Sequence, residues 1–82
     1  MGILKVYKEI SRVTAAVAAG TVPGVISITA LTVPLKVGDN VYVNTPNGFS
    51  YKLEIAGADL AIGATALRYN TTTTNIFLQG IA

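Results

Sequence analysis

Apolar and polar residues alternate most clearly between residues 41 and 55, where the pattern predicts a β-hairpin. A two-residue Asn-Gly turn would pair Val43 with Lys52 and mix apolar and charged side chains on one face. A three-residue loop instead pairs Val43 with Tyr51 and Val41 with Leu53, so that burial favours this register. The loop then consists of Pro46, Asn47 and Gly48. We expect Gly48 to have a positive φ, because the third loop residue of such a hairpin is left-handed.

The rest of the chain contains shorter runs of the same period, separated by turn residues. Residues 25–31 predict a strand with Ile26, Ile28 and Ala30 on one face and Ser27, Thr29 and Leu31 on the other. A turn at Gly38 and Asp39, in which Asp39 caps its own backbone, leads into the hairpin. Further strands are expected over residues 12–18, 64–69 and 76–82. The chain is therefore predicted to be all-β, a small antiparallel barrel or sandwich of about six short strands.

The first twelve residues are predicted to be an extended arm, followed by a single domain over residues 13–82. Apolar residues are interspersed with Lys5, Lys8 and Glu9 in this segment, a pattern that one or two helical turns over residues 3–10 would also fit. We expect the arm to add a strand to the open sheet edge of a neighbouring subunit.

The stretch from residue 13 to residue 35 lacks charged residues and is long enough for a membrane-spanning helix. Gly20, Pro23 and Gly24 would interrupt such a helix at its centre. The many threonines of the stretch favour strands instead. A membrane-active protein that uses residues 13–35 is therefore an alternative, and the expected partner is not a membrane.

The amino-acid composition argues against a catalytic, metal-binding or cofactor-binding site. The chain has 82 residues and neither histidine nor cysteine, and its four acidic residues show no metal-ligand spacing. Its serines have no histidine to activate them, so that no catalytic residue, metal or cofactor is expected and the protein is predicted not to be an enzyme. The net charge of +2 is too small to predict a nucleic-acid partner.

Hydrophobic residues make up 51% of the chain and charged residues only 12%. A chain of this size buries about 60–65% of its unfolded surface, so it cannot hide all its apolar groups. We expect neighbouring protein subunits to cover the remainder, as in permanent complexes with apolar interfaces.

The tyrosines allow a second interpretation. Tyr42 and Lys52 are predicted to lie side by side on the outer face of the hairpin, where a tyrosine ring could stack on a sugar. With the loop that contains Thr71 to Thr74, they could form a carbohydrate- or receptor-binding site.

Two segments resemble small β-modules of bacteriophage virion proteins. They are Leu31-Thr32-Val33-Pro34-Leu35-Lys36-Val37-Gly38-Asp39-Asn40-Val41-Tyr42-Val43 and Ala61-Ile62-Gly63-Ala64-Thr65-Ala66-Leu67. A free-standing chain of this length is most similar to a capsid decoration, or cement, protein. The resemblance implies a non-enzymatic virion protein on the capsid surface, assembled in the host cytoplasm. A tail or fibre module that binds carbohydrate or a receptor is the alternative.

The expected partners are the major capsid protein and further copies of this chain, grouped as a homotrimer. Apolar residues of the arm and of the last strand are expected to make these contacts. They are Ile3, Leu4, Val6, Tyr7, Ile10, Phe77 and Leu78.

Overall fold

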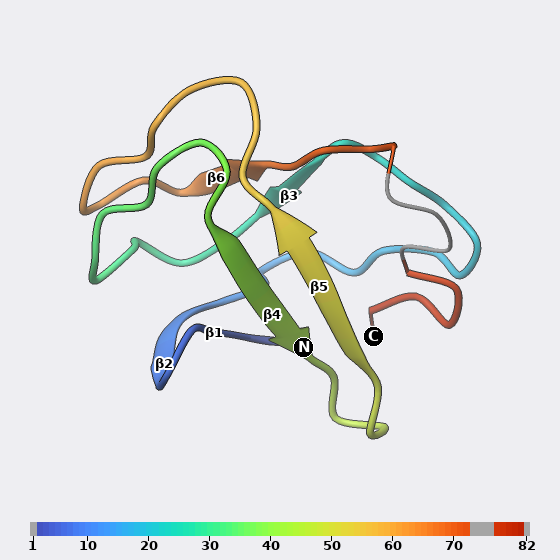
Figure 1. Ribbon diagram of the computed structural model, residues 1–82. Helices are drawn as coiled ribbons and strands as arrows, with labels where there is room; N and C mark the ends of the chain where they lie inside the picture. The colour runs from blue at the N-terminus through green and yellow to red at the C-terminus, as the bar shows by residue number, and fades with distance from the viewer. Residues whose placement is uncertain (1, 73–76, 82) are drawn as a thin grey trace.

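The computed structural model describes residues 2–72 and 77–81 and shows two antiparallel sheets (Figure 1). The four-stranded sheet has the order β2-β1-β4-β5, and the two-stranded sheet pairs β3 with β6. The strands are β1 (Ile3–Lys5), β2 (Glu9–Arg12), β3 (Val25–Ser27), β4 (Asn40–Asn44), β5 (Ser50–Glu54) and β6 (Ala66–Arg68). The predicted all-β fold with six short strands is confirmed, and the two sheets form a sandwich rather than a closed barrel.

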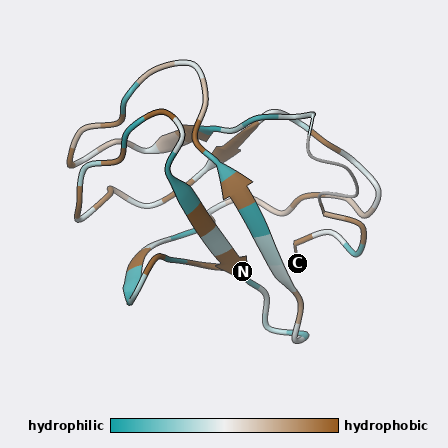
Figure 2. Ribbon diagram, viewed as in Figure 1, coloured by the Kyte–Doolittle hydropathy of each residue, from teal (hydrophilic) through white to brown (hydrophobic). Residues whose placement is uncertain are grey.

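The β4–β5 hairpin has the predicted register. Val41 pairs with Leu53 and Val43 with Tyr51, and Gly48 has a φ of 93°. Hydrophilic and hydrophobic residues alternate along both strands (Figure 2). The valines and Leu53 are buried on the inner face, while Tyr42 and Lys52 are exposed on the outer face.

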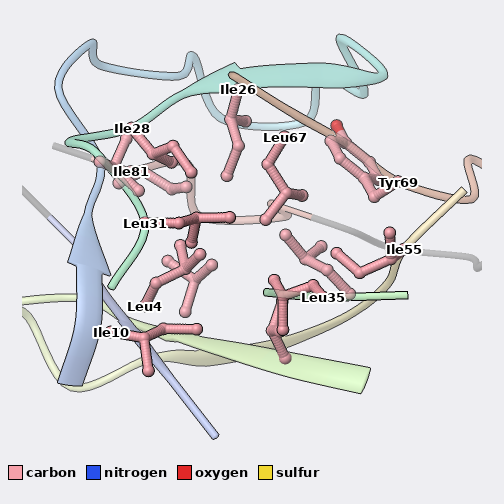
Figure 3. Packing of buried hydrophobic residues seen from close by; sticks show 14 of the residues in the cluster. Leu4, Ile10, Ile26, Ile28, Leu31, Leu35, Ile55, Leu67, Tyr69 and Ile81 are labelled. Carbon is pink, nitrogen blue, oxygen red and sulfur yellow. The ribbon is translucent and has the colours of Figure 1, made fainter. Parts of the chain in front are cut away.

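The core lies between the two sheets, where side chains from β1, β2 and β4 meet those of β3, β6 and the connecting segments (Figure 3). It is closed by isolated bridges, among them Val13 with Ile28 and Ile55 with Tyr69. The buried apolar residues are Leu4, Ile10, Val13, Ile26, Ile28, Leu31, Leu35, Val41, Val43, Leu53, Ile55, Leu67, Tyr69, Phe77 and Ile81.

The expectation of a separate arm over residues 1–12 is wrong. Within it, β1 and β2 form a hairpin, and β1 also pairs with β4 inside the four-stranded sheet. The register of this hairpin shifts between Leu4 and Lys5, which leaves Ile10 of β2 without a partner in β1, as in a β-bulge. Leu4 and Ile10 are both buried, so the segment belongs to the core of its own chain.

Three other predicted strands differ from the structure. Residues 12–18 contain only the end of β2 and single bridges at Val13 and Val17, and residues 64–69 contain the shorter β6. In the segment 76–82, residues 77–79 form a turn and Ile81 bridges to Val17, while residues 76 and 82 lie outside the described residues. Phe77 has a φ of 54°, a left-handed backbone conformation that cannot continue a strand.

The face assignment of residues 25–31 is also partly wrong. Ile26 and Ile28 are both buried and thus share a face, but Ala30, predicted on the same face, is exposed, and Leu31, predicted on the other, is buried. The strand ends at Ser27, so its alternation does not extend to these two residues.

Candidate functional site

An apolar groove of about 450 Å³ lies where the β1–β2 turn meets the segment that leads into β4. The turn residues Val6 and Tyr7 form one side of it, and Tyr7 is 96% exposed. Leu35 and Ile10 belong to the core and connect the groove to it (Figure 3). The residues that line the groove are Val6, Tyr7, Lys8, Ile10, Val33, Pro34, Leu35, Asp39 and Asn40.

Hydrogen bonds from backbone N–H groups fix the side of the groove that residues 33–40 supply. The N–H of Leu35 donates to the carbonyl of Leu60 at 2.9 Å, and the N–H of Leu60 donates back at 2.7 Å. The carboxylate of Asp39 accepts a hydrogen bond from the N–H of Lys36. This contact lies in the turn predicted at Gly38 and Asp39. The carboxylate of Asp59 accepts from the N–H of Val37 across 22 positions of the chain. This side of the groove is therefore tied to the distant segment that contains Asp59 and Leu60.

A second surface lies on the outer face of the four-stranded sheet. The register places Lys5 opposite Tyr42, and Tyr42 opposite Lys52, in a single row across three strands. Asn44 and Ser50 form the neighbouring pair of the same face. An exposed aromatic ring thus lies between two lysines and beside uncharged polar groups.

The acidic residues of this face are engaged by neighbours. Glu9 forms a bidentate ion pair with Arg12, at 3.1 and 3.2 Å, and this contact raises the pKa of Arg12 above its usual value. The carboxylate of Glu54 accepts a hydrogen bond from Asn70 at 3.0 Å. Lys5 and Lys52 have no ion-pair or hydrogen-bond partner within residues 2–72 and 77–81.

The structure brings three of the predicted contact residues together, since Val6, Tyr7 and Ile10 all line the groove. Leu4 and Phe77, like Ile10, are buried in the core of this chain, and burial removes them as primary contacts with a partner. Ile3 is half-buried in β1, and the exposed Leu78 is not among the residues that line the groove.

Sequence reasoning missed the contributions of Val33, Pro34 and Lys5 to these two surfaces. Val33 and Pro34 belong to a region without a strand pattern, and no local signal places them against the β1–β2 turn. Lys5 belongs to the segment predicted as an arm outside the sheet, and an arm would not align it with Tyr42.

Tyr51 and Tyr69 have structural contacts within their own chain. Tyr51 and Tyr69 pack edge-on against Phe77, with ring centroids 5.2 and 5.5 Å apart. The Tyr51 hydroxyl donates to the carbonyl of Gly80 and accepts from the N–H of Gln79, each at 3.1 Å. The Tyr69 hydroxyl accepts from the N–H of Gly24 at 3.0 Å, and burial raises the pKa of Tyr69.

Within the described part of the chain, no group of three or more acidic, histidine or cysteine residues could hold a metal ion. The described residues also contain no helix that is long and apolar enough to span a membrane. No protein-family model, curated protein or solved structure matches this chain.

Proposed function

We propose that this protein is a non-enzymatic structural subunit that docks in many copies onto a larger protein assembly through the groove beside Tyr7. The observation that supports the proposal is an apolar groove, with an almost fully exposed tyrosine at its side, on a fold that already has a closed core. An exposed apolar surface of this kind is typical of protein interaction sites.

The groove suits a protein surface that presents an aliphatic side chain. Val6, Val33 and Pro34 offer apolar contacts, and Lys8 at the groove can pair with an acidic residue of the partner. Tyrosine is among the residues that contribute most to binding at interfaces, because its ring buries a large area with little loss of side-chain freedom.

The area of the molecule limits how such a contact is made. A standard interface takes about 800 Å² from each partner. This is about a sixth of the 4607 Å² that the chain exposes. The contact therefore extends from the groove to neighbouring residues, and the exposed Val37 lies in the turn directly after the groove residue Leu35.

The specific form of the proposal is decoration and stabilisation of a bacteriophage capsid, with the major capsid protein as the partner. It rests on the resemblance of residues 31–43 and 61–67 to virion β-modules. Copies grouped as a homotrimer around a threefold axis of the shell would present three grooves to the shell at once, and such multivalency strengthens attachment.

The test adds the purified protein to shells assembled from the major capsid protein that is encoded in the same genome. Tyr7→Ser is expected to leave the fold intact and to lower co-sedimentation with the shells at least about tenfold, a loss of about 1.4 kcal/mol. Ile62→Ser, which removes an exposed apolar side chain from another turn, is the matched control and is expected to bind normally. Equal binding of Tyr7→Ser and the unaltered protein would show that the groove is not the docking site. Absence of a capsid gene from that genome would reject the capsid as the partner.

A further inference from the structure

The row Lys5, Tyr42 and Lys52 crosses the centre of the four-stranded sheet, with one residue from each of β1, β4 and β5. Neighbouring strands lie about 4.8 Å apart, so the two lysines are anchored roughly 10 Å from each other, on either side of the tyrosine. Because all three residues belong to paired strands, the backbone holds this spacing without help from a loop.

The ring of Tyr42 is available for contact. It is 42% exposed, and within the described residues it stacks on no other aromatic ring. Asn40, Asn44 and Ser50 surround it on the same face and supply amide and hydroxyl groups. An apolar ring bordered by such groups offers both a stacking surface and hydrogen-bond partners.

Basic side chains are in slight excess on this face. The register places Glu9 opposite Lys5, and Glu9 also forms the ion pair with Arg12. Glu54 accepts a hydrogen bond from the neutral amide of Asn70, which leaves the charge of Glu54 in place. Lys5, Arg12 and Lys52 exceed these two carboxylates by one charge, and the two lysines that flank Tyr42 can attract a negative ligand that lies over its ring.

We infer that this face binds an acidic oligosaccharide, with one sugar ring stacked on Tyr42 and its carboxylate or sulfate groups held by Lys5 and Lys52. The C–H groups of a sugar ring carry partial positive charge and meet the negative face of the tyrosine ring. The amides and Ser50 bind the sugar hydroxyls. A single-stranded nucleic acid fits less well, because it stacks successive bases on several aromatic rings and this row contains one.

Of the residues named for this binding site, only Asn40 also lines the docking groove, and the substitutions that test the two sites, Tyr42→Thr and Tyr7→Ser, lie outside this overlap. Failure of the shell-binding experiment therefore leaves the saccharide proposal open to its own test, and the reverse also holds.

The experiment titrates the protein with tetragalacturonic acid, its neutral methyl ester and a thymidine tetranucleotide, and follows the backbone amides by nuclear magnetic resonance. The acidic saccharide is expected to shift the amides of β1, β4 and β5 and to bind at least about fivefold more tightly than the ester. Tyr42→Thr is expected to raise the dissociation constant at least about tenfold, as loss of a stacked ring does. Lys5→Gln and Lys52→Gln should each raise it severalfold, and added salt should weaken binding because exposed charges are screened.

Lys36→Gln is the matched control, since it removes a lysine from an exposed turn outside this face. An unchanged dissociation constant for this variant supports the site. An equal loss of affinity in Lys36→Gln and Lys52→Gln would show that binding depends only on net charge, and this would overturn the proposal. Absence of saturable binding, or preference for the tetranucleotide, would also overturn it.

Discussion

At the scale of single residues, ionisation of the buried Tyr69 makes the stability of the fold depend on pH. Its hydroxyl is the acceptor for the N–H of Gly24, and burial raises its pKa above the ordinary value of 10.0. Well below pH 10 both the folded and the unfolded protein carry a protonated Tyr69. As the pH rises further, the unfolded protein ionises this residue first, so the folded state loses stability.

Tyr69→Phe is therefore expected to have two effects. Near neutral pH it should lower the free energy of unfolding by about 1–3 kcal/mol, because the N–H of Gly24 loses its partner. Above pH 10 the gap between the two proteins should narrow, since only the unaltered chain has a Tyr69 that can ionise. Denaturant unfolding at a series of pH values measures this gap, and a gap that stays constant or widens would contradict the assignment.

Two glycines at turns give a prediction that separates backbone strain from steric contact. Gly48 and Gly80 both have positive φ, at 93° and 72°. A Cβ at Gly48 would meet nothing within 4 Å, whereas one at Gly80 would lie 2.6 Å from the carbonyl oxygen of Val17. Gly48→Ala should cost about 1 kcal/mol from the left-handed conformation alone. Gly80→Ala should cost clearly more, because backbone atoms must move, and equal losses in thermal unfolding would rule out the close approach.

At the scale of elements, the β2 strand is held by side-chain hydrogen bonds as well as by its pairing with β1. The hydroxyl of Ser11 donates to the carbonyl of Thr29 at 2.6 Å, and the hydroxyl of Thr29 accepts from the N–H of Arg12 at 3.1 Å. The N–H of Thr29 also donates to the carbonyl of Arg12. The outer edge of β2 is thereby joined to the segment after β3.

Thr29→Val keeps the shape of the side chain and removes its hydroxyl. We expect a loss of about 1–2 kcal/mol in the free energy of unfolding. The amide of Arg12 should exchange its hydrogen faster, because it loses its acceptor. Thr14→Val is the control, since the Thr14 side chain is exposed and has no hydrogen bond among the described residues. Unchanged exchange at Arg12 in Thr29→Val would contradict this role.

The elements that could be predicted from the sequence are those whose pattern is local. The β4–β5 hairpin follows from strict alternation and from Gly48, which together select one register. Ile10 and its neighbour Ser11 are both buried because of the β-bulge, and a bulge interrupts the period by which strands are recognised. Val13 and Val17 each pair through one bridge with a distant segment, and such contacts have no local period.

The same reasoning explains which parts of the candidate sites were predicted. Tyr42 and Lys52 were placed side by side because they belong to one hairpin. Tyr7 was expected at an interface, but the groove beside it depends on residues 33–35, which reach the β1–β2 turn only through the tertiary fold. The contact between Asp59 and Val37 that steadies this side of the groove likewise joins residues far apart in the chain.

At the scale of the whole molecule, the apolar surplus is divided between a complete core and an apolar part of the surface. A folded monomer of 8.5 kDa is expected to expose about 4,700 Å², and this chain exposes 4607 Å². Its radius of gyration of 11.3 Å is close to the roughly 11.7 Å expected for a compact domain of this length. Several large apolar side chains are nonetheless exposed, namely Val6, Tyr7, Val22, Val25, Val37, Tyr42, Phe49, Ile62 and Leu78.

A chain whose core is closed by its own residues should not need neighbours to fold. We therefore expect the denaturant midpoint of the isolated protein to be the same at low and high micromolar concentration. In an obligate oligomer the midpoint would rise with concentration, because association is part of its stability. Tyr7→Ser and Ile62→Ser should leave the midpoint almost unchanged, since both side chains are exposed in the single chain. A midpoint that rises with concentration, and falls in Tyr7→Ser alone, would show that copies of this chain cover the groove before any larger assembly does.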